Sequence, residues 1–162
     1  PLLLQSATPR LITWMMAREY YEIAAMGWIF RLSGMIPTSR NGRDMAAMRS
    51  ALRVLKRGGL LGVFPEGRIE TTRELLPFHP GVAMLAMRCG APVYPAYLDG
   101  MQRGRSMLQA CLLPGHAAVR FGEPIQPPPC EPTRELLRQT AMQLRSAVQA
   151  LQSAQMENFN TT

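Results

Sequence analysis

Short apolar runs of strand length alternate along this chain with longer amphipathic segments, and this alternation limits the fold more than any other feature. The runs that we predict to be strands cover residues 11–16, 35–38, 60–64, 93–98 and 117–121. Helices are predicted at residues 18–33, 41–57, 81–88 and 133–153. This order is typical of an α/β domain in which helices flank a mainly parallel central sheet.

The chain is long enough for one domain, and 47% of its 162 residues are apolar, which allows a sizeable core. We divide it into residues 1–125, which hold the predicted sheet, and residues 126–162. The second part is a proline-rich linker followed by an amphipathic helix, whose apolar residues are Leu137, Ala141, Leu144, Val148 and Leu151. Their spacing places them on one face, so we expect this helix to pack on the same domain.

The charge is strongly basic and unevenly distributed. The chain has 18 Lys and Arg against 11 Asp and Glu, and residues 1–60 hold nine of the basic residues and three of the acidic ones. Because an arginine fork binds phosphate or carboxylate through two hydrogen bonds, the excess predicts an anionic partner: a nucleic acid, a phospholipid surface or a phosphorylated small molecule. Arg49, Arg53 and Lys56, with Arg57 beside them, lie on one side of the helix predicted at residues 41–57, where they either face solvent or contact anionic lipid.

Cysteine usage and hydropathy exclude several classes of protein. The three cysteines are widely separated and include no Cys-x-x-Cys pair, so neither a disulfide scaffold nor a zinc site is indicated, and a reducing compartment is expected. The apolar runs at residues 11–17 and 23–30 are too short to cross a bilayer, which takes about 20 residues. We therefore expect any membrane contact to be peripheral or to depend on a segment outside this chain.

A carboxylate and a guanidinium flank a glycine directly after one predicted strand, in the sequence Phe64-Pro65-Glu66-Gly67-Arg68. Open α/β sheets bind their ligands at the carboxyl ends of the strands. Pro65 ends the hydrogen bonding of the strand, and Gly67 permits the close approach of a substrate. Taken alone, the pentapeptide fits an ordinary loop with a local Glu–Arg pair at least as well.

Four sequence blocks occur in a fixed order around this motif. They are Gly34-Met35-Ile36-Pro37-Thr38-Ser39-Arg40, Phe64-Pro65-Glu66-Gly67, Pro77-Phe78-His79-Pro80-Gly81 and Pro92-Val93-Tyr94-Pro95, and a closing strand, Phe121-Gly122-Glu123-Pro124-Ile125, follows them. In this order the sequence resembles the glycerophospholipid acyltransferase family, which includes the lysophosphatidic acid acyltransferases. The resemblance covers most of residues 1–125 and implies the α/β fold of that family.

The sequence departs from the family pattern in two places. Members carry a His-x-x-x-x-Asp block that supplies a histidine base and its orienting aspartate, and neither His79 nor His116 stands in such a block. We expect His79 to have a structural role or to lie at the fringe of the substrate, and His116 to be solvated. Because an apolar run like the one that begins at Pro1 follows the aspartate in the family, we expect the missing His/Asp pair to lie just upstream of Pro1. Many members also have Thr-Arg after Phe-Pro-Glu-Gly, where this chain has Arg68 and Ile69.

The resemblance implies transfer of a fatty acyl group from a thioester to the hydroxyl of a lysophospholipid such as 1-acyl-glycerol 3-phosphate, in phospholipid synthesis. The thioester is carried by acyl carrier protein or coenzyme A, and no metal and no further cofactor is expected. The resemblance implies Glu66 and Gly67 as residues of the catalytic centre. It implies Arg40, Arg68 and Arg18 as ligands of the substrate phosphate, and Phe64, Pro65, Gly81, Pro92 and Pro95 as residues that shape the motifs.

The same resemblance places the protein at the cytoplasmic face of a membrane, against an anionic lipid surface. The alternative is a non-catalytic module that binds anionic lipid or phosphate through the same basic cleft. A His-x-x-x-x-Asp block just before Pro1 would favour the enzyme, and its absence there would favour the module. Nucleic acid is not an expected partner, because the chain lacks the interleaved aromatic and basic residues of single-strand binders and has no recognisable helix-turn-helix.

Overall fold

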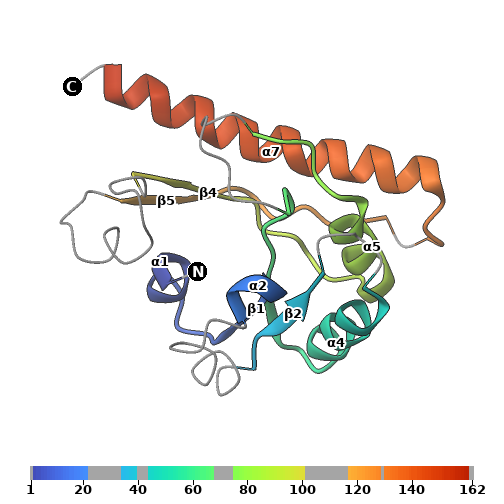
Figure 1. Cartoon of the computed structure of the whole chain (residues 1–162). Coiled ribbons are helices and arrows are strands. Elements are labelled where there is room, and N and C mark those ends of the chain that lie inside the picture. The colour runs from blue at the N-terminus through green and yellow to red at the C-terminus, as the bar shows by residue number, and fades with distance from the viewer. Residues whose placement is uncertain are drawn as a thin grey trace.

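Three short parallel strands form the central sheet of the computed structural model, which describes residues 2–21, 34–39, 44–67, 75–100, 117–128 and 130–160 (Figure 1). In chain order the elements are α1 (Leu2–Ser6), β1 (Ile12–Ala17), α2 (Arg18–Tyr21), β2 (Ile36–Thr38), α4 (Met45–Lys56), β3 (Leu60–Gly62), α5 (Pro80–Cys89), β4 (Ala96–Asp99), β5 (Ala118–Phe121) and α7 (Arg134–Asn160). The strand order is β2-β1-β3, with Met15 opposite Ile36 and Ile12 opposite Leu60. The predicted α/β fold with a parallel sheet is therefore confirmed.

The last two strands form a separate antiparallel pair, in which Ala96 lies opposite Phe121. The predicted parallel arrangement thus holds for β1, β2 and β3 but not for these two. An isolated antiparallel bridge between Val93 and Ile125 extends the pair. The strand predicted at residues 93–98 pairs continuously only from Ala96, because Pro95 has no amide to donate to the ladder. Figure 1 shows α7 running along this pair.

The predicted helices are present, with shifted ends. α4 begins after Asp44, whose carboxylate caps it, and ends two residues before Gly58. α5 ends at Gly90, which adopts the left-handed conformation that favours glycine. α7 extends beyond the predicted end at residue 153 to Asn160. Of the helix predicted at residues 18–33, α2 covers the first turn, and residues 22–33 lie outside the described part of the chain.

Two apolar clusters join the helices. The buried residues of the first come from β2, α4 and α5, and they are Ile36, Ala47, Ala51 and Leu85. Those of the second, between α5 and α7, are Ala83, Met87, Leu137 and Ala141. α5 therefore lies between α4 and α7 and buries residues on both sides.

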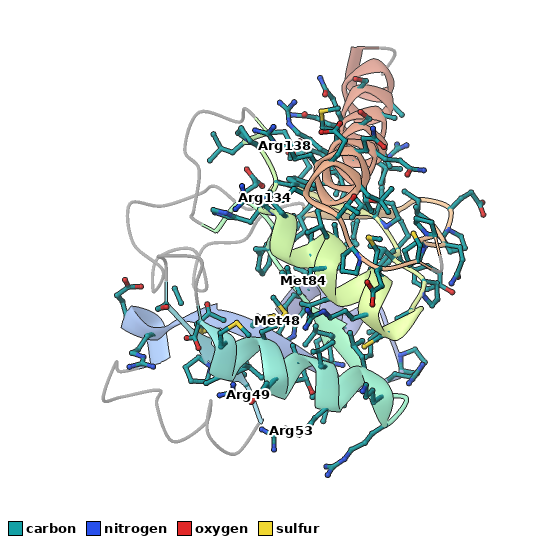
Figure 2. The ribbon with its side chains drawn as sticks, turned by 90° about the vertical axis from the view of Figure 1, so that its right-hand side faces the viewer. Met48, Arg49, Arg53, Met84, Arg134 and Arg138 are labelled. Carbon is teal, nitrogen blue, oxygen red and sulfur yellow. The ribbon has the colours of Figure 1, made fainter. Side chains whose placement is uncertain are left out.

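The buried face of α4 differs slightly from the predicted one. Ala47 and Ala51 are its buried residues, whereas Met48 is partly buried and Met45 is 59% exposed. Figure 2 shows Met48 on the side of α4 that faces α5, and Arg49 on the side turned away. Within the described ranges, no helix is both long and apolar enough to cross a membrane.

Candidate active site

The carboxyl ends of β1, β2 and β3 meet at one edge of the sheet, because the three strands run in the same direction. Arg18 follows β1 directly, Ser39 follows β2, and the turn Phe64–Gly67 comes shortly after β3. This is the edge at which open α/β sheets bind ligands. The fold thus brings Arg18, Glu66 and Gly67, which lie far apart in the sequence, to the same edge.

Aromatic packing anchors the turn to the sheet. The rings of Trp14 and Phe64 stack with their centroids 5.5 Å apart and their planes 19° apart. Trp14 comes from β1 and is 4% exposed. A Cβ atom on Gly62 would lie 2.5 Å from the Trp14 ring, so the absence of a side chain at Gly62 allows the ring to pack over β3. Phe64 is therefore held against the centre of the sheet as the chain leaves β3.

The turn closes on a glycine in the left-handed region. The Gly67 amide donates a hydrogen bond to the Phe64 carbonyl over 3.2 Å, and Gly67 has a φ of 69°. Residues with a Cβ atom rarely adopt this conformation, because Cβ then approaches the following carbonyl oxygen. The motif glycine is thus required by the backbone of the turn.

Two hydrogen bonds tie this turn to the segment before α5. The amide of Leu76 donates to Oε2 of the half-buried Glu66 over 3.1 Å. The amide of His79 donates to the Pro65 carbonyl over 2.9 Å. The Glu66 carboxylate therefore bridges the two ends of the stretch between the second and third sequence blocks, and its geometry is that of an orienting group.

The imidazole of His79 lies against the motif glycine. A Cβ atom on Gly67 would lie 2.8 Å from His79 Nε2 and 2.9 Å from Cδ2. His79 is exposed and precedes Pro80 at the start of α5. Sequence reasoning assigned this histidine a structural or peripheral role, and the structure places it in contact with the turn. His116 lies outside the described residues.

A residue of the C-terminal helix also reaches this region, which sequence reasoning did not anticipate. Nη2 of Arg145 donates to the Leu75 carbonyl over 2.8 Å. Nε of the same side chain is buried and makes no hydrogen bond within the described structure. α7 thereby holds the segment that in turn donates to Glu66. Arg145 carried no motif signal, because its partner is 70 residues away in the sequence.

Another carboxylate at this edge is that of Asp44, which joins the end of β2 to the start of α4. Its Oδ1 accepts the Ala47 amide over 2.9 Å and its Oδ2 accepts the Ser39 amide over 3.1 Å. The hydrogen bond from Ala47 is the largest cause that lowers the pKa of the Asp44 carboxyl, and the amide of Ser39 and the positive charge of Arg18 lower it further. The carboxylate form of Asp44 is therefore stabilised where it caps α4.

The predicted site residues are only partly covered. Arg18 is exposed at the start of α2, while Arg40 and Arg68 lie outside the described residues. The phosphate-binding roles of the three arginines and the catalytic roles of Glu66 and Gly67 stay predictions.

The start of the chain bears on the predicted base. The His/Asp pair is expected upstream of Pro1, and Pro1 itself lies outside the described residues. The apolar run that begins there was expected to follow the missing block directly, and its described part, from Leu2, is the start of α1. The position of the base relative to the Glu66 carboxylate therefore stays a prediction.

The predicted motif-shaping residues beyond the turn occupy structural positions. Gly81 lies in the first turn of α5, and a Cβ atom added to it would lie 3.7 Å from Met48 Cε. Pro95 is buried, and its carbonyl accepts the Gly122 amide over 2.9 Å. Pro92 is exposed ahead of β4. These residues set the paths of α5 and β4 rather than contact the turn.

Comparison with known proteins identifies the family of the chain. The model of the acyltransferase family matches residues 1–99. The chain belongs to the acyltransferase family. The family resemblance read from the four sequence blocks is thereby confirmed.

Two relatives and one solved structure show how far the similarity extends. Over 117 residues the chain is 25% identical to a 1-acyl-sn-glycerol-3-phosphate acyltransferase of Bacillus subtilis (strain 168), covering 72% of this chain and 56% of the relative. Over 82 residues it is 28% identical to the chloroplastic 1-acyl-sn-glycerol-3-phosphate acyltransferase BAT2 of Brassica napus, covering 49% of this chain and 24% of the relative. The crystal structure of the 1-acyl-sn-glycerophosphate (LPA) acyltransferase PlsC from Thermotoga maritima shares the fold with a TM-score of 0.60 at 21% identity, over 86% of this chain and 56% of that one. The acyltransferase chain described here thus spans about half the length of the bacterial relative.

Proposed function

We propose that this acyltransferase moves a fatty acyl group from a thioester to the free hydroxyl of a lysophospholipid, with 1-acyl-glycerol 3-phosphate as the acceptor. The names of the two relatives and of the T. maritima enzyme support this acceptor. The observation that carries the proposal is the Glu66-Gly67 turn at the carboxyl edge of a parallel sheet, in a chain of the acyltransferase family. Acyl carrier protein or coenzyme A serves as the acyl carrier, and the reaction needs no other cofactor.

The reaction forms a bond between the acceptor oxygen and the thioester carbonyl carbon and breaks the carbon–sulfur bond. The hydroxyl proton passes to a base and then to the leaving thiolate. A histidine of a His-x-x-x-x-Asp block upstream of Pro1 is the base in this proposal. Because a thioester is already activated, positioning of the alcohol and stabilisation of the oxyanion supply most of the rate.

The described residues contribute positioning. Glu66, held by the Leu76 amide, keeps the turn in place, and Gly67 supplies the left-handed backbone that closes it. Arg40 and Arg68 bind the acceptor phosphate, with Arg18 as a third cation at this edge. Their direct sequence neighbours support this assignment, because Ser39 and Gly67 both follow strands at the carboxyl edge.

Acceptor binding by the 162-residue chain tests the phosphate site without requiring turnover. We expect 1-acyl-glycerol 3-phosphate to bind and 1-acylglycerol, which lacks the phosphate, to bind at least about tenfold more weakly, since each charge-assisted bond to the phosphate is lost. Arg68→Gln should weaken the binding of the phosphorylated acceptor. Arg88→Gln is the matched control. Arg88 is exposed in the last turn of α5, whereas the Phe64–Gly67 turn contacts the start of that helix.

Turnover is measured on a chain extended upstream of Pro1, as thioester consumption with coenzyme A and acyl carrier protein donors. We expect Glu66→Ala, which removes the acceptor of the Leu76 amide, to lower kcat/KM while Arg88→Gln leaves it unchanged. Phosphate-dependent binding without any thioester consumption would support the non-catalytic module instead. Equal binding of both acceptors, or full activity of Glu66→Ala and Arg68→Gln, would remove the proposed site.

We also propose that the protein acts peripherally at the cytoplasmic face of a membrane, where its acceptor is found. The formal net charge of +7 supports attraction to an anionic surface. Co-sedimentation with vesicles of phosphatidylglycerol should exceed that with phosphatidylcholine vesicles and should weaken as salt is added. Equal binding to both vesicle types would argue against this location.

A further inference from the structure

A hollow of about 320 Å³ lies at the opposite edge of the parallel sheet from the candidate active site. It lies between the chain entering β2 and the last two turns of α4, and its lining residues are Gly34, Met35, Ile36, Pro37, Ser50, Arg53, Val54 and Arg57. In a parallel sheet, residues at the start of a strand lie at the edge opposite to those that follow its end. Small-molecule sites have volumes of roughly 300–1,000 Å³, so this hollow is large enough to admit a small ligand.

The wall of the hollow that α4 provides lies beside the buried Ala47 and Ala51 face of the helix. Its residues 50, 53, 54 and 57 are spaced at i, i+3, i+4 and i+7, which places them on one side of the helix. Arg53 and Arg57 are exposed there, so the rim of the hollow carries two guanidinium groups. The hydrogen bond that Arg53 makes is from Nη2 to the neutral Ser50 Oγ, over 3.0 Å. No acidic residue is found in α4 or among the described residues that line the hollow.

The position of these arginines near a helix C-terminus does not by itself account for them. Cations in the last turn of a helix are stabilised by its dipole whichever side they are on, and Lys56 serves this purpose without lining the hollow. Arg10, just before β1, reaches the same edge and donates to the carbonyl of Gly58. Positive charge therefore gathers around a recess whose other walls, from Met35 to Pro37, are apolar.

We propose that this recess, the Arg53–Arg57 pocket, binds an acidic amphiphile: a molecule with one carboxylate or phosphate head and a short apolar body. The two guanidinium groups bind the head through charge-assisted hydrogen bonds, and Met35, Ile36, Pro37 and Val54 contact the body. The pocket is separate from the acyl-transfer edge, so its occupancy does not depend on the function proposed above.

Calorimetric titration of the folded chain with decanoate tests the pocket. We expect one saturable site, with decanol and acetate each at least about tenfold weaker, because one lacks the charge and the other lacks the apolar body. Decyl phosphate should bind to the same site and compete with decanoate, whereas inorganic phosphate should not. Arg53→Gln with Arg57→Gln should weaken decanoate binding at least about tenfold.

The control variant removes two arginine charges from another helix. Arg134→Gln with Arg138→Gln also changes two exposed positions four residues apart, and Figure 2 shows these arginines on α7, away from α4. Decanoate affinity should be unchanged in this variant and in Arg49→Gln, which alters a residue of α4 outside the lining.

A charge reversal distinguishes loss of the site from loss of the fold. Arg53→Glu with Arg57→Glu should lose decanoate binding and gain binding of decylammonium, which a misfolded chain would not do selectively. Decanoate binding that survives in the Arg53→Gln/Arg57→Gln variant would overturn the proposal, because the ligand would then occupy another site, such as the acyl-transfer edge. An equal loss in the α7 control, or no saturable binding at all, would also overturn it.

Discussion

Replacing Gly67 by alanine tests how the motif turn is built. Gly67 has a φ of 69°, and the left-handed region costs a residue with a Cβ atom about 1–2 kcal/mol. The new Cβ atom would also lie 2.8 Å from His79 Nε2. That separation forces the imidazole out of its preferred rotamer, at a cost of about 0.5–1.5 kcal/mol. His79 is exposed and free to swing outward, so we expect a total loss in unfolding free energy of about 2 kcal/mol, with roughly half from each cause.

A double-mutant cycle with His79→Ala separates the two causes. The His79 side chain makes no capping hydrogen bond to α5, so His79→Ala alone should cost less than about 0.5 kcal/mol. Without the imidazole, Gly67→Ala should cost only the backbone part, which gives a coupling of about 1 kcal/mol between the two positions. Urea unfolding followed by circular dichroism yields the four free energies. If Gly67→Ala costs the same in both backgrounds, the imidazole does not lie against the turn and the reasoning is refuted.

Two further substitutions probe the sheet and its carboxyl edge. Gly62→Ala should lower the unfolding free energy by about 2–3 kcal/mol, because the new Cβ atom meets the buried Trp14 ring, which has little room to shift. Combining it with Trp14→Leu should recover part of the loss. An unchanged urea midpoint for Gly62→Ala would contradict the contact. Asp44→Asn keeps a capping side chain but removes the charge. Because the folded-state pKa of Asp44 is lowered, the charge contributes to stability above about pH 4, and this contribution is lost as the pH falls below that value. The free energy of unfolding of the wild type should therefore exceed that of Asp44→Asn by less than about 1 kcal/mol at pH 7, since solvent largely screens the carboxylate. In unfolding curves measured at decreasing pH, this difference should shrink toward about pH 2. A difference that does not depend on pH would contradict the assignment.

Local spacing in the sequence was enough to place most helices and strands, but not to choose their most buried residues. In α4 the predicted stripe of long side chains includes Met45, which is exposed, whereas Ala47 and Ala51 form the buried face. Alanine is compatible with both core and surface, so periodicity alone does not predict whether a given alanine is buried. Its small size lets the helix approach β2 closely, which depends on the tertiary packing of Ile36 and Leu85.

Contacts between distant segments had no local signal at all. Nothing in residues 93–98 or 117–121 encodes that β4 and β5 run in opposite directions, because apolar runs look alike in either orientation. The bond from Arg145 to the Leu75 carbonyl joins residues of two parts that the sequence analysis treated separately. The position of His79 against Gly67 likewise follows from the hydrogen bond between the His79 amide and the Pro65 carbonyl, which no pattern predicts.

Asp44 and Glu66 each hold together two parts of the chain at the active-site edge. Asp44 accepts the amide of Ser39, and Glu66 accepts the amide of Leu76, so each carboxylate closes a stretch of chain that begins at a strand end. Two of the three predicted phosphate-binding arginines fall inside these stretches, Arg40 in the first and Arg68 in the second. Loss of the Glu66 carboxylate would release the Leu76 end of the stretch that carries Arg68.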